Sequence, residues 1–186
     1  AFQINGAKFL IENKRALLGD EMGLGKSIQA IIALKFLYRM GKLKTGILLC
    51  PKSVIADWEE KLWEWAPEIR VRKVRGSKEE RKILWKTPSH LYLTNYETLG
   101  NDLISSYEDF NLHEEVITKL DYSIMDEIQK IKNPSSNITK RARLLKTDIR
   151  WGLSGTPLEN RTDDLIAIFA YIVPKLLRYE EKNNLP

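Results

Sequence analysis

The sequence predicts an α/β domain built on a doubly wound parallel sheet with helices on both faces. Short apolar runs recur along the chain, separated by segments long enough to hold a helix. Parallel neighbours cannot be joined by tight hairpins, so crossovers of this length favour a parallel sheet whose two faces are covered. Polar clusters follow five of the six runs, at the strand ends where such sheets bind their ligands.

The apolar runs are short and rich in aliphatic residues, which is typical of buried strands. Between them, an apolar helix is expected to end near Gly41, an amphipathic helix to surround Trp58, and an exposed helix to carry the mixed charges at 78–82. Residues 108–115 are polar and irregular, so a loop or a short helix is expected there. The six expected strands cover residues 16–18, 47–50, 69–74, 91–94, 122–125 and 149–153.

Composition narrows the class of protein. A chain of 186 residues can bury one sizeable core, so a single domain is expected. Cys50, the one cysteine, lies in an apolar run and is expected to pack as a small hydrophobe. With only His90 and His113 beside it, a zinc site built by the protein is disfavoured. A disulfide framework is excluded, which favours a reducing intracellular compartment: cytosol, nucleoid or nucleus.

Net charge and hydropathy constrain the partners. Lysine and arginine outnumber aspartate and glutamate by 30 to 25, an excess that permits a polyanionic partner without requiring one. No apolar stretch approaches the roughly 20 residues that span a bilayer. The first residues also lack the basic-then-apolar order of a signal peptide. A membrane partner is therefore not expected.

Residues 20–27, Asp-Glu-Met-Gly-Leu-Gly-Lys-Ser, have the features of a phosphate-binding loop between a strand and an apolar helix. Glycines let the backbone turn tightly and approach phosphate oxygens, and the helix start offers unpaired amides. Lys26 would contact the β- and γ-phosphates of ATP, and Ser27 would give its hydroxyl to Mg²⁺. The alternative interpretation is an ordinary glycine-rich turn with a solvated lysine. The predicted nucleotide-binding residues of the loop are Gly23, Leu24, Gly25, Lys26 and Ser27.

A carboxylate pair, Asp126 and Glu127, follows the apolar run 122–125. An aspartate at a strand end can hold Mg²⁺ through water, and an adjacent glutamate can orient and deprotonate the water that attacks the γ-phosphate. A solvated acidic pair is the alternative interpretation. The position of Asp126 and Glu127 after a phosphate loop in the sequence favours the catalytic interpretation.

These motifs resemble those of the Swi/Snf family of superfamily two helicase-like ATPases, and the resemblance runs from residue 2 to about residue 174. Asp20 departs from the general phosphate-loop pattern, where glycine is expected, but it matches the version of the loop found in this family. Ser27 replaces the usual threonine. Gln3, followed by Gly6, is similar to an upstream segment whose glutamine recognises adenine in this family, so the resemblance implies that Gln3 binds adenine. A surface glutamine without this role is the alternative.

Two further motifs carry the same resemblance. Residues 126–133 resemble the Asp-Glu-Gly-His or Asp-Glu-Ala-Gln box of the family, except that Ile128 replaces a small third residue. A bulkier side chain there puts the packing near the γ-phosphate in question. The implied catalytic residues are Lys26, Asp126, Glu127 and Gln129. Residues 153–160 resemble motif III, which implies that Ser154, Gly155 and Thr156 couple hydrolysis to movement of the lobe.

Motifs Ia and Ib of the family are similar to residues 49–58 and 94–98, on the side of the lobe that faces DNA. The resemblance implies that Lys52, Ser53 and Thr94 contact DNA phosphates. Such contacts position a duplex without recognising its base sequence, as a motor that moves over any sequence requires.

The resemblance as a whole implies a RecA-like lobe that uses ATP and Mg²⁺ and tracks along double-stranded DNA. Residues 1–174 form the expected first lobe, and residues 175–186 would lead towards a second RecA-like lobe, the expected protein partner. Two alternatives remain at this stage: a helicase lobe acting on RNA or single-stranded DNA, and a nucleotide-gated binding module without turnover of its own.

Two sets of residues are interpreted as structural. The five tryptophans could stack on bases, but packing in the core explains them with fewer assumptions. The basic run 140–146 is expected to be a solvated helix face rather than the wall of a nucleic-acid groove. The tryptophans are Trp58, Trp63, Trp65, Trp85 and Trp151.

Overall fold

The computed structural model describes residues 2–21, 23–104, 110–155 and 162–174, without the side chains of 162–164. In these residues six strands form one sheet in the order β1-β6-β5-β2-β4-β3, and every neighbouring pair is parallel. The predicted doubly wound α/β fold is confirmed, and each strand overlaps a predicted run. The strands are β1 (Arg15–Leu18), β2 (Gly46–Cys50), β3 (Val71–Lys73), β4 (Leu91–Asn95), β5 (Tyr122–Asp126) and β6 (Ile149–Leu153).

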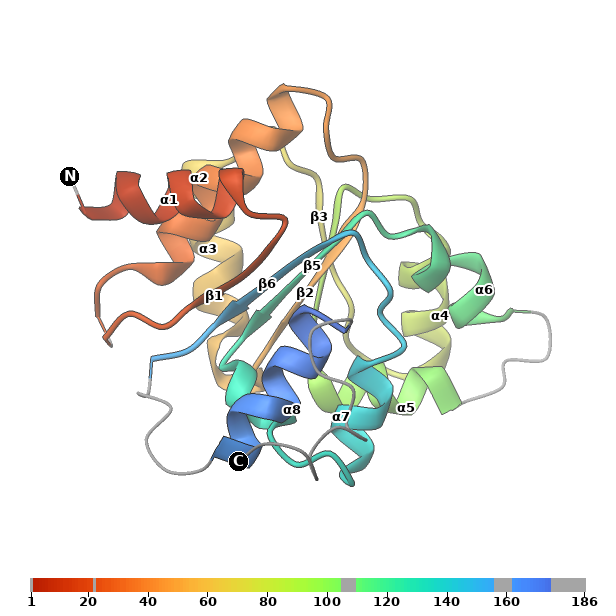
Figure 1. Cartoon of the computed structure of the whole chain (residues 1–186). Coiled ribbons are helices and arrows are strands. Elements are labelled where there is room, and N and C mark those ends of the chain that lie inside the picture. The colour runs from red at the N-terminus through yellow and green to blue at the C-terminus, as the bar shows by residue number, and fades with distance from the viewer. Residues whose placement is uncertain (1, 22, 105–109, 156–161, 175–186) are drawn as a thin grey trace.

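Helices cover both faces of the sheet, α1 to α3 on one side and α4 to α8 on the other (Figure 1). Successive residues of a strand point to opposite faces, and β2 shows how this builds two cores. Leu48 and Cys50 pack in the core beneath α1 to α3, whereas Ile47 and Leu49 pack in the other. The helices are α1 (Phe2–Glu12), α2 (Lys26–Arg39), α3 (Ile55–Trp65), α4 (Lys78–Lys86), α5 (Tyr96–Ile104), α6 (Leu112–Glu115), α7 (Asn137–Ala142) and α8 (Thr162–Ile172), with 3₁₀ turns η1 (Lys52–Val54), η2 (Ile117–Lys119) and η3 (Ile128–Ile131).

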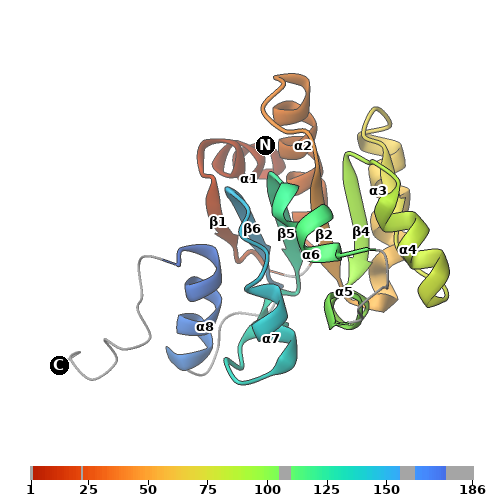
Figure 2. The same cartoon turned by 90° about the vertical axis from the view of Figure 1, so that its right-hand side faces the viewer.

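The strand register brings distant polar clusters to one edge of the sheet. Leu153 of β6 pairs with Leu18 of β1 on one side and with Asp126 of β5 on the other. Cys50 of β2 pairs with Asn95 of β4. Because all strands run in parallel, the residues after each strand meet at its carboxyl edge. Figure 2 shows β1, β6, β5, β2 and β4 side by side in this order. The phosphate loop after β1 and the acidic pair after β5 therefore lie two strands apart.

The tryptophans divide into two groups. Trp58, Trp85 and Trp151 are buried, as predicted, but Trp63 is 78% exposed and Trp65 is 42% exposed. Trp58 and Leu62 share the buried face of α3 because they are four residues apart. Trp63 lies one residue further, about 100° around the helix, and therefore faces away from the core. The prediction that all five pack in the core is wrong for Trp63 and Trp65.

The structure also tests the predictions for Cys50 and for the two charged segments. Cys50 is fully buried, and burial raises the pKa of its thiol to about 12, so it behaves as a small hydrophobe. The mixed-charge segment 78–82 lies in α4 and begins with a capping box, but its Arg81 is partly buried and bonded to Asp102. The basic run 140–146 is helical only as far as Ala142, and Arg141 and Arg143 are partly buried, so the solvated helix face expected there is only partly correct. Within the described residues, no helix is both long and apolar enough to cross a membrane.

Candidate nucleotide-binding site

The glycines of the phosphate loop adopt the conformations that the sequence predicts. Gly23 and Gly25 have φ of 85° and 72°, in the left-handed region that glycine occupies without strain. Gly25 also caps the start of α2, so the unpaired amides of that helix face the loop. Leu24 between them is 39% exposed. The loop therefore presents an open surface of backbone amides, which suits an anion.

Lys26 is bonded to the backbone of its own loop in this structure. Its Nζ donates to the backbone oxygens of Asp20 and Glu21, each at 2.7 Å. These carbonyls keep the ammonium group at the mouth of the loop, where it could exchange them for phosphate oxygens.

Gln29 is a site residue that sequence analysis missed. It is fully buried, and its Nε2 donates to the Leu24 oxygen at 3.1 Å and, more weakly, to Asp20 Oδ2 at 3.4 Å. Gly6 of α1 packs against it so closely that a Cβ on Gly6 would lie 1.6 Å from Gln29 Oε1. The available signal was a lone polar residue on the buried face of an apolar helix.

The same packing brings Gln3 to the loop. A Cβ on Gly25 would lie 3.0 Å from Gln3 Nε2, so the exposed Gln3 side chain lies directly beside the left-handed turn. Its amide can both donate and accept hydrogen bonds, as recognition of a base edge requires.

Asp126, at the end of β5, is held by three neighbours. Its Oδ2 accepts from Trp58 Nε1 at 2.8 Å, its Oδ1 accepts from the Glu127 amide at 3.0 Å, and its backbone oxygen accepts from the Tyr96 hydroxyl at 2.6 Å. Burial raises the pKa of Asp126, with the neighbouring Glu127 charge adding to the rise. A cation beside this carboxylate would compensate for its lost hydration.

Glu127 has an unusual backbone for a residue with a side chain. Its φ of 50° and ψ of 52° lie in the left-handed region, a strain that concentrates at functional sites. Gln129 Nε2 donates to Glu127 Oε2, and Gln129 Oε1 accepts from Ser154 Oγ at 3.0 Å. The Ser154 amide in turn bonds the oxygen of Leu18, at the end of β1. A continuous chain of hydrogen bonds thus joins the acidic pair to the motif III segment.

The structure accounts for the bulky residue in the acidic box. Ile128 is fully buried, and a Cβ on Gly152 of β6 would lie 2.4 Å from its Cδ1. Glycine on the neighbouring strand therefore makes room for isoleucine at this position. Gly155 is buried beside this region, whereas Thr156 lies outside the described residues.

Ser27 and Asp126 offer the oxygen atoms that Mg²⁺ prefers, and both lie at the carboxyl edge of the sheet. In the described residues, no cluster of three or more histidine, cysteine or acidic side chains could hold a metal. A magnesium ion would therefore take most of its ligands from water and phosphate, which is its usual mode of binding. These residues fit such an ion.

A groove follows the ends of β2, β3 and β4, at the same carboxyl edge of the sheet as the nucleotide loop. Its volume is about 790 Å³, and exposed Lys52 and Ser53 lie on its wall. Thr94 does not, because it is fully buried and its hydroxyl donates to the Val74 oxygen at 3.1 Å. The predicted phosphate contact by Thr94 is therefore wrong for this conformation. The other charged residues of the lining are Lys73, Arg75, Arg81, Glu97 and Lys130.

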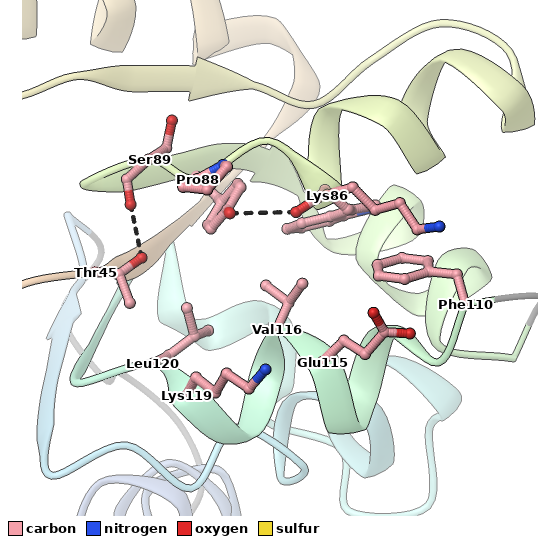
Figure 3. Close-up of a pocket in the computed structure, with 11 residues that line it drawn as sticks. Thr45, Lys86, Pro88, Ser89, Phe110, Glu115, Val116, Lys119 and Leu120 are labelled. Atoms are coloured by element: carbon pink, nitrogen blue, oxygen red, sulfur yellow. Dashed lines mark hydrogen bonds between the residues drawn. The ribbon is translucent and has the colours of Figure 1, made fainter.

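A second pocket, shown in Figure 3, lies at the opposite edge of the sheet. Thr45, Ser89 and Leu120 in its wall each come just before a strand, so the pocket is at the amino ends. Its volume is about 390 Å³ and its lining is mostly aromatic and aliphatic. It contains no glycine loop and no acidic pair, and is therefore distinct from the nucleotide site.

The fold and the site together define a class of protein. A parallel sheet with a glycine-rich loop, a lysine and a hydroxyl after one strand, and with an acidic pair two strands away, is the arrangement of phosphate-loop nucleoside triphosphatase domains. The model of the SNF2-related domain matches residues 2–183. The chain therefore belongs to the SNF2-related domain family and is an ATPase domain of the Swi/Snf type. The match extends past residue 174, and the predicted domain boundary there stays a prediction.

Two similar proteins match most of this chain. An uncharacterized ATP-dependent helicase of Mycoplasma pneumoniae is 36% identical over 184 residues, covering 95% of this chain and 17% of that protein. The human SWI/SNF-related regulator of chromatin subfamily A containing DEAD/H box 1 is 34% identical over 163 residues, covering 86% of this chain and 16% of its own length. The chain thus spans about a sixth of these relatives.

A solved structure shares the fold. The Sulfolobus solfataricus SWI2/SNF2 ATPase core in complex with dsDNA superposes with a TM-score of 0.83 at 33% identity. The alignment covers 97% of this chain and 37% of that one. The RecA-like architecture expected from sequence is confirmed.

Proposed function

We propose that this chain is the first RecA-like lobe of a motor that hydrolyses ATP and moves along double-stranded DNA. The observation that carries the proposal is the shared edge of the sheet: the phosphate loop, the acidic pair and the basic groove all follow strand ends there. A nucleotide and a polyanion bound along this edge could each affect the binding of the other, because both would contact segments that follow neighbouring strands of one sheet.

In this proposal the loop residues bind ATP and the acidic pair carries hydrolysis. Gln3 contacts the adenine, Lys26 leaves the loop carbonyls for the β- and γ-phosphates, and Ser27 and Asp126 hold the metal, the latter partly through water. When bound there, Mg²⁺ would offset the negative charge of the phosphates. Glu127 orients the attacking water and takes its proton. Gly23, Leu24 and Gly25 supply the backbone of the phosphate cradle.

The hydrogen bonds from Glu127 through Gln129 to Ser154 support the proposed coupling between hydrolysis and movement. A displacement of the Glu127 carboxylate would be transmitted through its hydrogen bond to Gln129, and from Gln129 to Ser154. Gly155 and Thr156 would carry that shift onward. Thr156 keeps this role only as a prediction.

The basic groove is the proposed contact with DNA. Lys52, Arg75 and Lys130 line it, and such side chains bind phosphates of any sequence. The similar Sulfolobus ATPase core was solved in complex with double-stranded DNA, which supports a duplex as the partner. A second RecA-like lobe would supply the rest of the duplex contact and the arginines that complete the ATP site. An intracellular location, in cytoplasm, nucleoid or nucleus, is part of the same proposal.

One experiment separates this proposal from its alternatives. Phosphate release by a two-lobe protein containing this chain is measured with duplex DNA, single-stranded DNA, RNA and no nucleic acid. Strong stimulation by the duplex supports the proposal, and greater stimulation by single strands or RNA favours a helicase. Nucleotide binding without turnover under all conditions favours the gated binding module. Lys52→Ala should weaken duplex stimulation, whereas Lys42→Ala, an exposed lysine after α2, should not.

A further inference from the structure

Helix α3 donates hydrogen bonds to both residues that we propose as metal ligands. Trp58 Nε1 bonds Asp126 Oδ2 at 2.8 Å, and Lys61 Nζ bonds Ser27 Oγ at 3.2 Å. Trp58 and Lys61 are three residues apart, so they lie on the same side of the helix. One helix therefore contacts both proposed metal ligands: Asp126 at the end of β5 and Ser27 in the first turn of α2.

Lys61 adds positive charge where the loop is already positive. Ser27 is in the first turn of α2, beside Lys26 and the positive end of the helix dipole. The Lys61 side chain is only 31% exposed, and it pairs with Asp57 at 2.7 Å, one turn earlier in α3. An ammonium group partly withdrawn from water in such a place gains most from a nearby anion or from a hydroxyl that can accept its hydrogen bond.

We propose that Lys61 is a positioning residue that holds the Ser27 hydroxyl, and that Mg²⁺ must displace it in order to bind there with the nucleotide. The inference rests on the proposed function, because it assumes that Ser27 is a metal ligand. Both partners seek the same oxygen, and both are cations, so they compete for the site. Lys61 therefore raises the Mg²⁺ concentration that nucleotide binding requires.

The Asp57 carboxylate sets the strength of this competition. It shares the Lys61 ammonium group with Ser27, and it offers that group an alternative position one turn away. Without Asp57, Lys61 would remain on Ser27 more firmly. Variants of Lys61 and Asp57 should thus change the Mg²⁺ requirement in opposite directions.

The test titrates Mg²⁺ against the full chain and a fluorescent ADP analogue, reading bound nucleotide rather than turnover. Lys61→Met should lower the half-saturating Mg²⁺ concentration about three- to tenfold, the scale of one charge interaction in a half-buried site. Asp57→Asn should raise it. Lys61→Arg should resemble the wild type, and so should Lys35→Met, a matched control because Lys35 pairs with Glu68 and the Trp65 oxygen elsewhere between α2 and α3. Thermal melting checks that each variant is folded.

The outcomes distinguish this inference from the proposed function. An unchanged or raised Mg²⁺ requirement in folded Lys61→Met, with nucleotide binding still dependent on Lys26, overturns the role of Lys61 and leaves the proposed function standing. If the wild type binds no nucleotide, or binds it equally well after Lys26→Ala, both are overturned.

Discussion

The ammonium group of Lys26 bonds two loop carbonyls in this structure, and it is the group that we expect to bind phosphate. Lys26→Ala should lower ATP affinity about ten- to a hundredfold, because a charged hydrogen bond contributes about 1.5–3 kcal/mol. Titration with a fluorescent ATP analogue measures the change. Lys8→Ala, on the exposed side of α1, is the control. Equal affinity in wild type and Lys26→Ala would remove the basis of the phosphate-loop assignment.

Glu127 combines a strained backbone with a hydrogen-bonded carboxylate. In a two-lobe protein, Glu127→Gln should keep ATP binding and slow hydrolysis about 10²- to 10⁴-fold, because an amide cannot take the proton of water. The glutamine can still accept the bond from Gln129, so the local geometry should survive. Single-turnover phosphate release is the measurement. Normal turnover would mean that another residue is the general base.

At the scale of elements, one buried carboxylate joins α4 to α5. Asp102 is 1% exposed and accepts hydrogen bonds from Arg81, with both carboxylate oxygens engaged, and from Trp85 Nε1 at 2.9 Å. Asp102→Ala leaves the Arg81 charge without this partner, and we expect it to cost about 3–5 kcal/mol of the free energy of unfolding. Urea denaturation measures the loss. Glu79→Ala, at an exposed position of α4, should change the free energy of unfolding little.

His90 links the start of β4 to α2 and should make stability depend on pH. Its Nδ1 accepts from the Arg70 amide at 3.0 Å, and its Nε2 lies 3.2 Å from the Tyr38 hydroxyl. Burial, and then the Arg70 charge, lower the pKa of His90 from its ordinary 6.5. The folded protein therefore binds this proton less readily than the unfolded chain.

The stabilisation from neutral His90 is present above pH 6.5 and is lost as the pH falls below that value. Thermal melting between about pH 7.5 and 5.5 should show a falling midpoint, with a shallower fall in His90→Gln. A slope that is the same in His90→Gln as in the wild type would contradict the assignment.

At the scale of the whole molecule, we expect the chain alone to bind nucleotide but to hydrolyse ATP very slowly, with little stimulation by DNA. An arginine finger contributes about 10³- to 10⁵-fold in rate in related phosphoryl transfers, and the proposed second lobe would supply it. One lobe also offers only part of the proposed phosphate contact, so DNA binding should be weak and sensitive to salt. Steady-state phosphate release by the chain, with and without duplex DNA, is compared with the two-lobe protein. Rapid DNA-stimulated turnover by the chain alone would refute this mechanism.

Local patterns in the sequence determined the strands, the glycine-rich loop and the acidic pair. Each is a contiguous run whose chemistry depends on neighbours along the chain: apolar residues for a strand, glycines for the left-handed turns at Gly23 and Gly25. Parallel pairing then followed from the length of the crossovers, and it brought these runs to one edge. The fold class and the general position of the site could therefore be predicted.

Tertiary structure alone decided which side chains meet at that edge. Lys61 reaches Ser27 across 34 residues of sequence and Trp58 reaches Asp126 across 68, because α3 packs with one particular rotation. The same rotation exposes Trp63, and the pairing of β3 with β4 buries the Thr94 hydroxyl against Val74. A periodic pattern gives the face of a helix only approximately, and one residue of rotation moves a side chain by about 100°. Contacts of this kind depend on packing between elements, which no single run of residues specifies.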